Sequence, residues 1–196
     1  MAYLNRDERR ELILQAAMRV ALADGFTGMT VRRIASEAGV ATGQVHHHFA
    51  SAGELKSQAF VRVIADLLEA DVLPHSATWR QRLHAMLGSN EGGFDPYIHL
   101  WREAQLLVSK EAELKGAYVL TMEMWHKKVL EIIHAGVAAR EFTPADTAEN
   151  IAWRLIALVC GLDGIYVLGM PDVDDVAFDR HLDAMISREL FYLPSP

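Results

Sequence analysis

The segment between residues 41 and 50 holds the side chains with the clearest capacity for specific hydrogen bonding. In a helix, the positions left facing outward are Thr42, Gly43, Gln44, His46 and His47. Hydroxyl, amide and imidazole groups both donate and accept hydrogen bonds, and a glutamine amide can form two of them with one adenine edge. Glycine leaves room for a close approach of the backbone. This set favours recognition of a polar surface over covalent chemistry.

The three consecutive histidines at 46–48 also raise the possibility of a metal site. Consecutive residues of a helix point about 100° apart, whereas ligands of one tetrahedral ion need i, i+3 or i+4 spacing. We therefore predict no metal here. His48 is expected to be a partly buried structural residue, with His46 and His47 on the outside.

No pattern in the chain indicates an enzyme. The sequence lacks G-x-S-x-G, H-E-x-x-H, a P-loop and a Rossmann glycine fingerprint. Its single cysteine, Cys160, is expected inside an apolar helix, where a thiol is usually inert. The sequence therefore predicts a non-enzyme that needs no cofactor.

Two short predicted helices position the polar side chains, and they meet at a tight turn. The first covers 31–38 with Thr30 as its cap, and the second covers 42–49 after Gly39-Val40. Short helices joined by a glycine-containing turn are typical of a helix-turn-helix. The residues expected to face inward are Val31, Ile34, Ala35, Ala38, Val40, Val45 and Phe49. The polar face could then enter a DNA major groove, which is about 12 Å wide.

Helical spacing continues on both sides of this pair, which predicts an all-α fold. A first helix is expected from about Arg6 to Asp24, ending at Gly25-Phe26. Ser51 and Glu54 have the spacing of a capping box before a fourth helix that runs to about residue 70.

The longer remainder reads as a helical bundle. Helices are predicted at about 77–88, 95–109, 111–140, 145–169 and 174–191, with breaks at 89–94, 142–144 and 171. The predicted domains are a helix-turn-helix domain at 1–55, with a connector helix to about residue 70, and an effector-binding and dimerisation domain at 56–196.

Charge is unevenly distributed between these parts. The whole chain carries −7, but residues 1–56 hold seven Lys/Arg and six Asp/Glu, so this part carries +1 and the rest −8. This nearly neutral N-terminal part, called the head below, is compatible with a small DNA contact patch and modest non-specific affinity for DNA.

Other features of the sequence predict a cytoplasmic protein that does not span a membrane. The chain turns charged from Arg6 onward and begins with no long apolar run, and one cysteine cannot form an intrachain disulfide. The longest uncharged apolar run, 155–162, is shorter than the roughly 18 residues that a membrane span needs.

The segment around the two short helices resembles the TetR family of bacterial repressors. That family's pattern runs Thr-hydrophobic-Arg-x-Ile-Ala-x-x-Ala-Gly-Val-Ser-x-Gly-x-hydrophobic-Tyr-x-His-Phe-x-Ser-Lys-x-Glu-Leu. The matching residues are Thr30, Arg32, Ile34, Ala35, Ala38, Gly39, Val40, Gly43, Val45, His48, Phe49, Ser51, Glu54 and Leu55. The resemblance is specific over residues 9–60 and weaker beyond them. It implies a sequence-specific transcriptional regulator, a repressor released from an inverted-repeat operator by a small-molecule effector.

The residues then expected to bind double-stranded operator DNA are Thr30, Arg32, Arg33, Thr42, Gly43, Gln44, His46 and His47. Three departures from the family pattern affect this set. Ala41 replaces a serine or threonine, which leaves Thr42 as the candidate cap of the recognition helix. His46 replaces a tyrosine, and Ala52 replaces a lysine, both of which typically touch phosphate in the family. We therefore expect weaker binding, or greater reliance on His46, Arg32 and Arg33.

In the remainder of the chain, residues 56–196 and called the body below, the resemblance implies a homodimer formed by the last two helices of each chain. The stretches 99–118 and 155–169 resemble the BetI-like subgroup, which suggests an effector cavity between body helices. The residues expected to line it are Trp101, Gln105, Met122, Trp125, His126, Cys160 and Tyr166. Glu103 and Asp163 would suit a cationic effector, although solvated carboxylates are commoner.

Several alternatives stay open from the sequence. The chain could be a helical protein-interaction module, or an activator rather than a repressor. The identity of the effector, the operator sequence and the number of dimers bound per operator cannot be derived from these residues.

Overall fold

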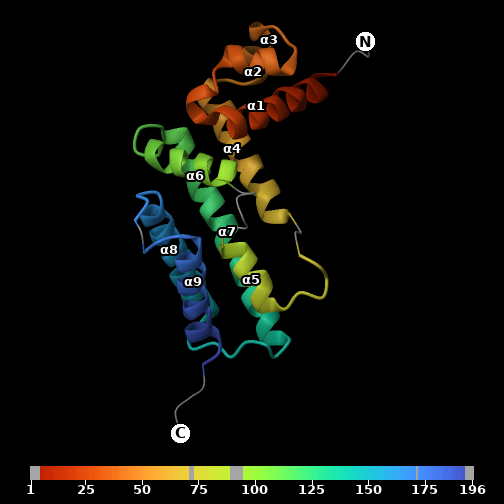
Figure 1. Cartoon of the computed structure of the whole chain (residues 1–196). Coiled ribbons are helices and arrows are strands. Elements are labelled where there is room, and N and C mark those ends of the chain that lie inside the picture. Colours follow the sequence, from red (N-terminus) through yellow and green to blue (C-terminus); the bar gives the residue numbers. More distant parts are fainter. Residues whose placement is uncertain (1–4, 71–72, 89–94, 171, 193–196) are drawn as a thin grey trace. The chain divides into compact units, whose positions relative to one another are not determined.

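A computed structural model describes residues 5–70, 73–88, 95–170 and 172–192, and its regular elements are all helices (Figure 1). The helices are α1 (Arg6–Gly28), α2 (Val31–Ala38), α3 (Thr42–His48), α4 (Ala52–Glu69), α5 (Trp79–Leu87), α6 (Asp95–Leu107), α7 (Ala112–Ala138), α8 (Ala148–Tyr166) and α9 (Asp175–Leu190). The predicted all-α class is confirmed. The predicted breaks at 89–94 and 171 lie outside the described residues.

The chain divides into two compact units. The first comprises residues 1–70 and 94–123, and the second comprises 71–93 and 124–196. The first unit thus contains α1–α4, α6 and the start of α7. The predicted domain boundary near residue 55 concerns which residues touch DNA, and it stays a prediction.

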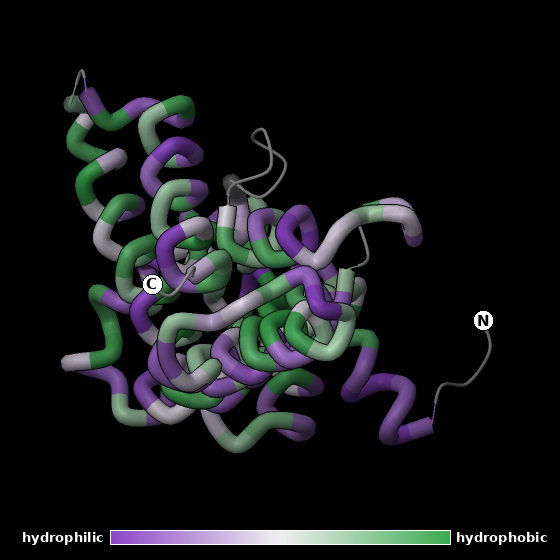
Figure 2. Tube along the Cα trace, turned by 90° about the horizontal axis from the view of Figure 1, so that it is seen from below, coloured by the Kyte–Doolittle hydropathy of each residue, from purple (hydrophilic) through white to green (hydrophobic). Residues whose placement is uncertain are grey.

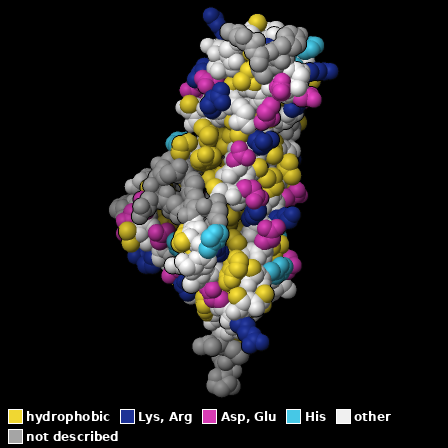
Figure 3. All heavy atoms as spheres, turned by 90° about the vertical axis from the view of Figure 1, so that its right-hand side faces the viewer, with side chains coloured by type: hydrophobic (Ala, Val, Ile, Leu, Met, Phe, Trp, Pro, Cys, Tyr) yellow, Lys and Arg dark blue, Asp and Glu magenta, His cyan; other side chains and the backbone are white. Residues whose placement is uncertain are grey.

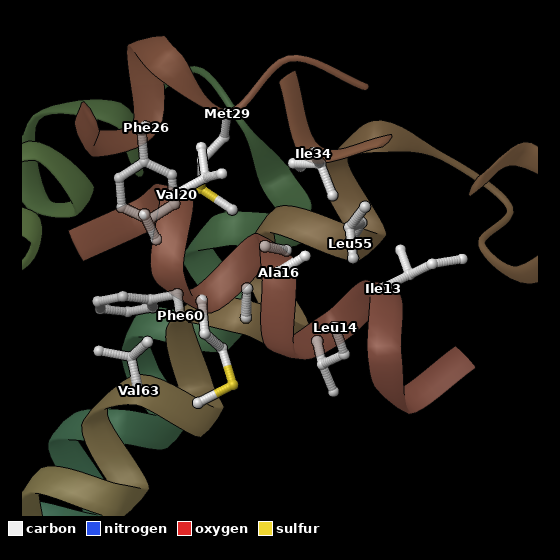
Figure 4. Close-up of a cluster of buried hydrophobic side chains, with 14 of the residues drawn as sticks. Ile13, Leu14, Ala16, Val20, Phe26, Met29, Ile34, Leu55, Phe60 and Val63 are labelled. Carbon is white, nitrogen blue, oxygen red and sulfur yellow. The ribbon is translucent and has the colours of Figure 1, made fainter. Parts of the chain in front are cut away.

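One hydrophobic core holds the first unit together. Side chains from α1, α2 and α4 converge in it, among them Ile13, Ile34, Leu55 and Phe60 (Figure 4). Each of these four is at most 1% exposed, and Leu100 of α6 joins the same core. This shared burial fixes the orientation of α2 and α3 on α1, because closely packed side chains allow few alternative crossings.

The end of α1 is a kink rather than a stop. Gly25 adopts φ 65° and ψ −176°, a conformation that is essentially restricted to glycine, and one further helical turn continues to Gly28. The Glu103 carboxylate of α6 accepts a hydrogen bond from the backbone N–H of Phe26 at 2.6 Å. The predicted interruption of the helix at Gly25 is therefore confirmed, and a further helical turn, up to Gly28, follows it.

The caps of the two short helices follow the sequence prediction in part. The Thr30 side chain accepts from the Arg33 N–H, and Gly39 ends α2 in the left-handed conformation. The N-cap of α3 is Ala41, which makes no side-chain bond, and Thr42 is already helical. Thr42 therefore does not cap α3.

The predicted capping box of α4 is only half formed. Ser51 accepts from the Glu54 N–H at 2.8 Å, as predicted. The Glu54 carboxylate, however, accepts from the N–H of Ala50 rather than from that of Ser51. The second hydrogen bond of the box, from the Ser51 N–H to the Glu54 carboxylate, is therefore replaced by one from the residue before it.

The second unit contains α5, the end of α7, α8 and α9. Its core includes Leu83, Ile133, Leu155 and Leu182, all fully buried. The helices are shorter than predicted by up to three residues at an end, and Thr147 caps the start of α8 and Asp174 that of α9. None of the described helices is both long and apolar enough to cross a lipid bilayer.

Candidate DNA-binding site

The α3 helix presents a polar face on a hydrophobic base. Thr42, Gly43, His46 and His47 are exposed and Gln44 is half-buried. Val45 is 2% exposed and Phe49, which follows the helix, is 3% exposed. In Figure 1, α3 lies beside α2 with α1 next to both. Five of the eight predicted DNA-binding residues thus lie on one short helix, and Thr30, Arg32 and Arg33 lie at the start of α2.

Gln44 has a partner that the sequence did not indicate. The Arg9 guanidinium of α1 donates from Nη1 to Gln44 Oε1 at 3.1 Å. Arg9 belongs to the hydrophilic first turns of α1 (Figure 2). No local spacing could reveal this pair, because the two residues are 35 positions apart.

The neighbouring Arg10 locks the start of α1 to the base of α3. Its guanidinium carbon lies 4.6 Å from the centre of the Phe49 ring, a cation–π distance. Its Nη2 also donates to Gln58 Oε1 of α4 at 2.6 Å. α1, α3 and α4 are therefore joined at the end of the unit that carries the recognition face.

The two predicted phosphate-binding arginines of α2 differ in their surroundings. Arg32 is exposed. Arg33 forms ion pairs of 2.9 Å with Asp24 and with Glu37. The hydrogen bond with Glu37, followed by that with Asp24, raises the pKa of Arg33 above its ordinary value. Arg33 thus shares its charge with two carboxylates, which weakens its attraction for phosphate.

Glu37 is also bound to a third cation. Arg19 of α1 donates to its carboxylate at 2.9 Å, and this bond, with that of Arg33, lowers the pKa of Glu37. Acidic and basic side chains are likewise interspersed on the face drawn in Figure 3. Arg19 and Arg33 are thus largely offset by the carboxylates of Asp24 and Glu37.

His48 is partly buried, as predicted, and its Nδ1 atom has no hydrogen-bond partner among the described residues. Its ring meets the His47 ring edge-on, with centroids 5.3 Å apart. Burial, and then the nearby charges of His47, Arg6, Arg9 and Arg10, lower the pKa of His48 below 6.5.

The lowered pKa of His48 predicts that the head loses stability in acid. The unfolded chain binds the proton more readily, so the contribution of neutral His48 is present above pH about 6.5 and is lost as the pH falls below it. We expect the thermal midpoint of His48→Gln to fall less than that of the wild type between pH 7.5 and 5.5. Equal slopes of midpoint against pH in the two proteins would contradict this role.

The predicted effector-binding residues fall in both units. Trp101, Gln105 and Met122 belong to the first unit, and Trp125, His126, Cys160 and Tyr166 to the second. Trp101 donates from Nε1 to the Tyr118 hydroxyl at 2.8 Å and packs against the core of the first unit. Gln105 is exposed, and Met122 is half-buried.

The four residues of the second unit have diverse surroundings. Trp125 donates to the Met86 carbonyl at 3.1 Å, and His126 stacks on Trp153 with centroids 4.2 Å apart. Burial raises the pKa of the Cys160 thiol, and Tyr166 is 39% exposed. A hollow in this unit is lined by other residues, including Leu73, Gln81 and His84. The effector cavity therefore stays a prediction.

The helix-turn-helix segment of this chain is similar to that of a known protein family. A family model described as "Bacterial regulatory proteins, tetR family" matches residues 13–55, which include α2, α3 and their caps. The regulator BetI of Rhizobium meliloti is 28% identical over 172 residues, which is 81% of this chain and 76% of BetI. The helix-turn-helix segment of this chain is therefore of the TetR type. The prediction of a DNA-binding transcriptional regulator that is not an enzyme is thereby confirmed.

Two further known proteins match this chain beyond residues 13–55. The repressor KstR2 of Mycolicibacterium smegmatis is 28% identical over 160 residues, which is 76% of this chain and 74% of KstR2. The solved structure of a transcriptional regulator from Saccharomonospora viridis, in complex with choline, superposes with a TM-score of 0.71 at 23% identity. It covers 94% of this chain and 98% of its own, which shows that the fold extends through both units.

Proposed function

We propose that this transcriptional regulator is a TetR family repressor that binds an inverted-repeat operator as a homodimer and is released by a small-molecule effector. The observation that carries the proposal is the outward polar face of α3, held on a buried base by Val45 and Phe49. DNA contact by Thr30, Arg32, Arg33, Thr42, Gly43, Gln44, His46 and His47 is part of the proposal. Binding to chromosomal DNA would place the protein in the cytoplasm.

The homodimer is supported by the surface of α8 and the residues after it. Trp153 is 46% exposed, and Ile165, Val167 and Leu168 are 40%, 59% and 69% exposed. Large apolar side chains exposed in number commonly mark a protein contact. A two-fold dimer would present two α3 helices about one DNA turn apart, which suits an inverted repeat.

The effector is proposed to act on the body, and the domain boundary near residue 55 to separate the DNA-binding part from it. The Saccharomonospora viridis regulator was solved with choline, so we choose choline as the first probe. Glu103, an acidic candidate for a cationic effector, already accepts the Phe26 N–H. Glu103 is thus tied to the end of α1 rather than presented to a ligand.

The test is selection of duplexes from random DNA by the purified protein, followed by fluorescence anisotropy on the selected duplex. We expect an inverted repeat that binds two chains, and a loss of about 1–3 kcal/mol of base discrimination at one position of each half-site in Gln44→Ala. Failure to enrich any sequence would overturn operator binding. Release of the duplex by choline, or by compounds screened after it, measures the effector part separately.

The two arginines of α2 should differ in this assay. Arg32→Ala should reduce the slope of log affinity against log salt by about one, because an exposed guanidinium that contacts phosphate releases one counterion. Arg33→Ala should reduce this slope by less than half of the reduction caused by Arg32→Ala, since Asp24 and Glu37 already hold the Arg33 guanidinium. Equal reductions in the two variants would show that both ion pairs open on DNA.

A further inference from the structure

The contact between Arg9 and Gln44 fixes which face of the Gln44 amide is free. A guanidinium carries only donors, so the amide atom that faces Arg9 Nη1 at 3.1 Å must be the oxygen. The Nε2 amino group then points away from Arg9. Both side chains are half-buried, which limits the rotamers that the pair can adopt.

The helix that carries Arg9 is itself held in place. The next residue, Arg10, contacts the Phe49 ring after α3 and Gln58 of α4. Because these contacts join α1 to the elements around the recognition helix, Arg9 approaches Gln44 from a fixed direction. A hydrogen bond between elements held in this way is preorganised before DNA arrives.

We propose that Arg9 is a specificity-determining residue, which orients the Gln44 amide so that Gln44 reads a hydrogen-bond acceptor on a base edge. The acceptors in the major groove are purine N7, guanine O6 and thymine O4, whereas cytosine presents an N4 donor. The Gln44 oxygen keeps a second lone pair, so the two-bond adenine contact expected from the sequence, in which this oxygen accepts from adenine N6 and Nε2 donates to N7, is compatible with this orientation. The proposal rests on the proposed operator binding.

The experiment uses the full-length protein and the duplex selected by the wild type. Every base pair of one half-site is substituted in turn, and affinities are measured for the wild type, Gln44→Ala, Arg9→Ala and the double variant. We expect Gln44→Ala to lose a preference of about 5- to 100-fold at one base pair. Arg9→Ala should lose at least about half of that preference on a logarithmic scale at the same pair, and the double variant should lose no more than Gln44→Ala.

Two further variants separate orientation from charge. Arg9→Lys keeps the positive charge but lacks the planar fork of donors, so it should keep the salt dependence and still lose part of the preference. Arg6→Ala, in the same first turns of α1, should weaken all duplexes by one common factor. Where the preferred base is a purine, replacing it by its 7-deaza analogue should weaken the wild type and leave Gln44→Ala unchanged. Thermal melting confirms that each variant is folded.

The outcomes distinguish the role of Arg9 from the proposed operator binding on which it rests. If the wild type enriches no sequence, operator binding and the role of Arg9 both fall. If it enriches an operator but Arg9→Ala weakens all duplexes equally, Arg9 is only a phosphate contact and the inference alone is overturned. The same holds if Gln44→Ala changes no base preference.

Discussion

Gly25→Ala should lower the free energy of unfolding by about 2–4 kcal/mol, since it adds backbone strain and disrupts a partly buried hydrogen bond. Gly25 has φ 65° and ψ −176°, where a side chain is strained. An added Cβ would also lie 2.6 Å from both Glu103 carboxylate oxygens, of which Oε2 accepts from the Phe26 N–H. The variant should unfold at a lower urea concentration than the wild type, as followed by circular dichroism.

Gly39→Ala is the matched control for this prediction. Gly39 has the same φ of 65°, but an added Cβ would meet nothing within 4 Å. Its cost should therefore be the left-handed strain alone, about 1–2 kcal/mol. If Gly25→Ala cost no more than Gly39→Ala, the contact between Glu103 and the end of α1 would contribute nothing to stability.

Gly136→Ala should lower the free energy of unfolding of the protein by about 2–3 kcal/mol, because overpacking a close contact forces side chains to move. The ring of Phe142 lies directly against Gly136, where the Cβ would be placed. Phe142 is only 3% exposed and meets the Phe191 ring edge-on. The backbone N–H of Phe142 also donates to the Gly136 carbonyl at 3.1 Å, which holds the backbone of Phe142 close to the end of α7.

Gly116→Ala, in the same helix, provides the control. An added Cβ at Gly116 would meet nothing within 4 Å. Alanine there should stabilise the protein by about 0.5–1 kcal/mol, because glycine in a helix interior loses more backbone entropy on folding. Urea unfolding of both variants gives the two signs directly. A stabilising Gly136→Ala would mean that Phe142 can leave Gly136 at little cost.

The local architecture of the head could be predicted from the sequence because its signals lie within a few residues of one another. Thr30 caps α2 three residues before the Arg33 N–H, and Gly39 ends it. Val45 and Phe49 are four positions apart, so the period of the helix puts both on the buried side. The outward placement of His46 and His47 follows from the same period.

Some local details still required the structure. Ala41 begins α3 without a side-chain cap, although Thr42 stands next to it. Glu54 bonds to Ala50 rather than to Ser51. A shift of one residue in a cap changes few contacts and little energy, so sequence patterns do not resolve it.

The sequence by itself thus determined the all-α class, the helix-turn-helix and the face of α3 that is available to DNA. Only the tertiary structure decided which charges remain available and how Gln44 is held. Arg9 is 35 residues from Gln44, and Glu103 is 77 residues from Phe26. Such pairs depend on the angles at which helices cross, which are set by packing of the whole core. Periodicity and caps report only the environment within a few turns of one helix, so they cannot specify these partners.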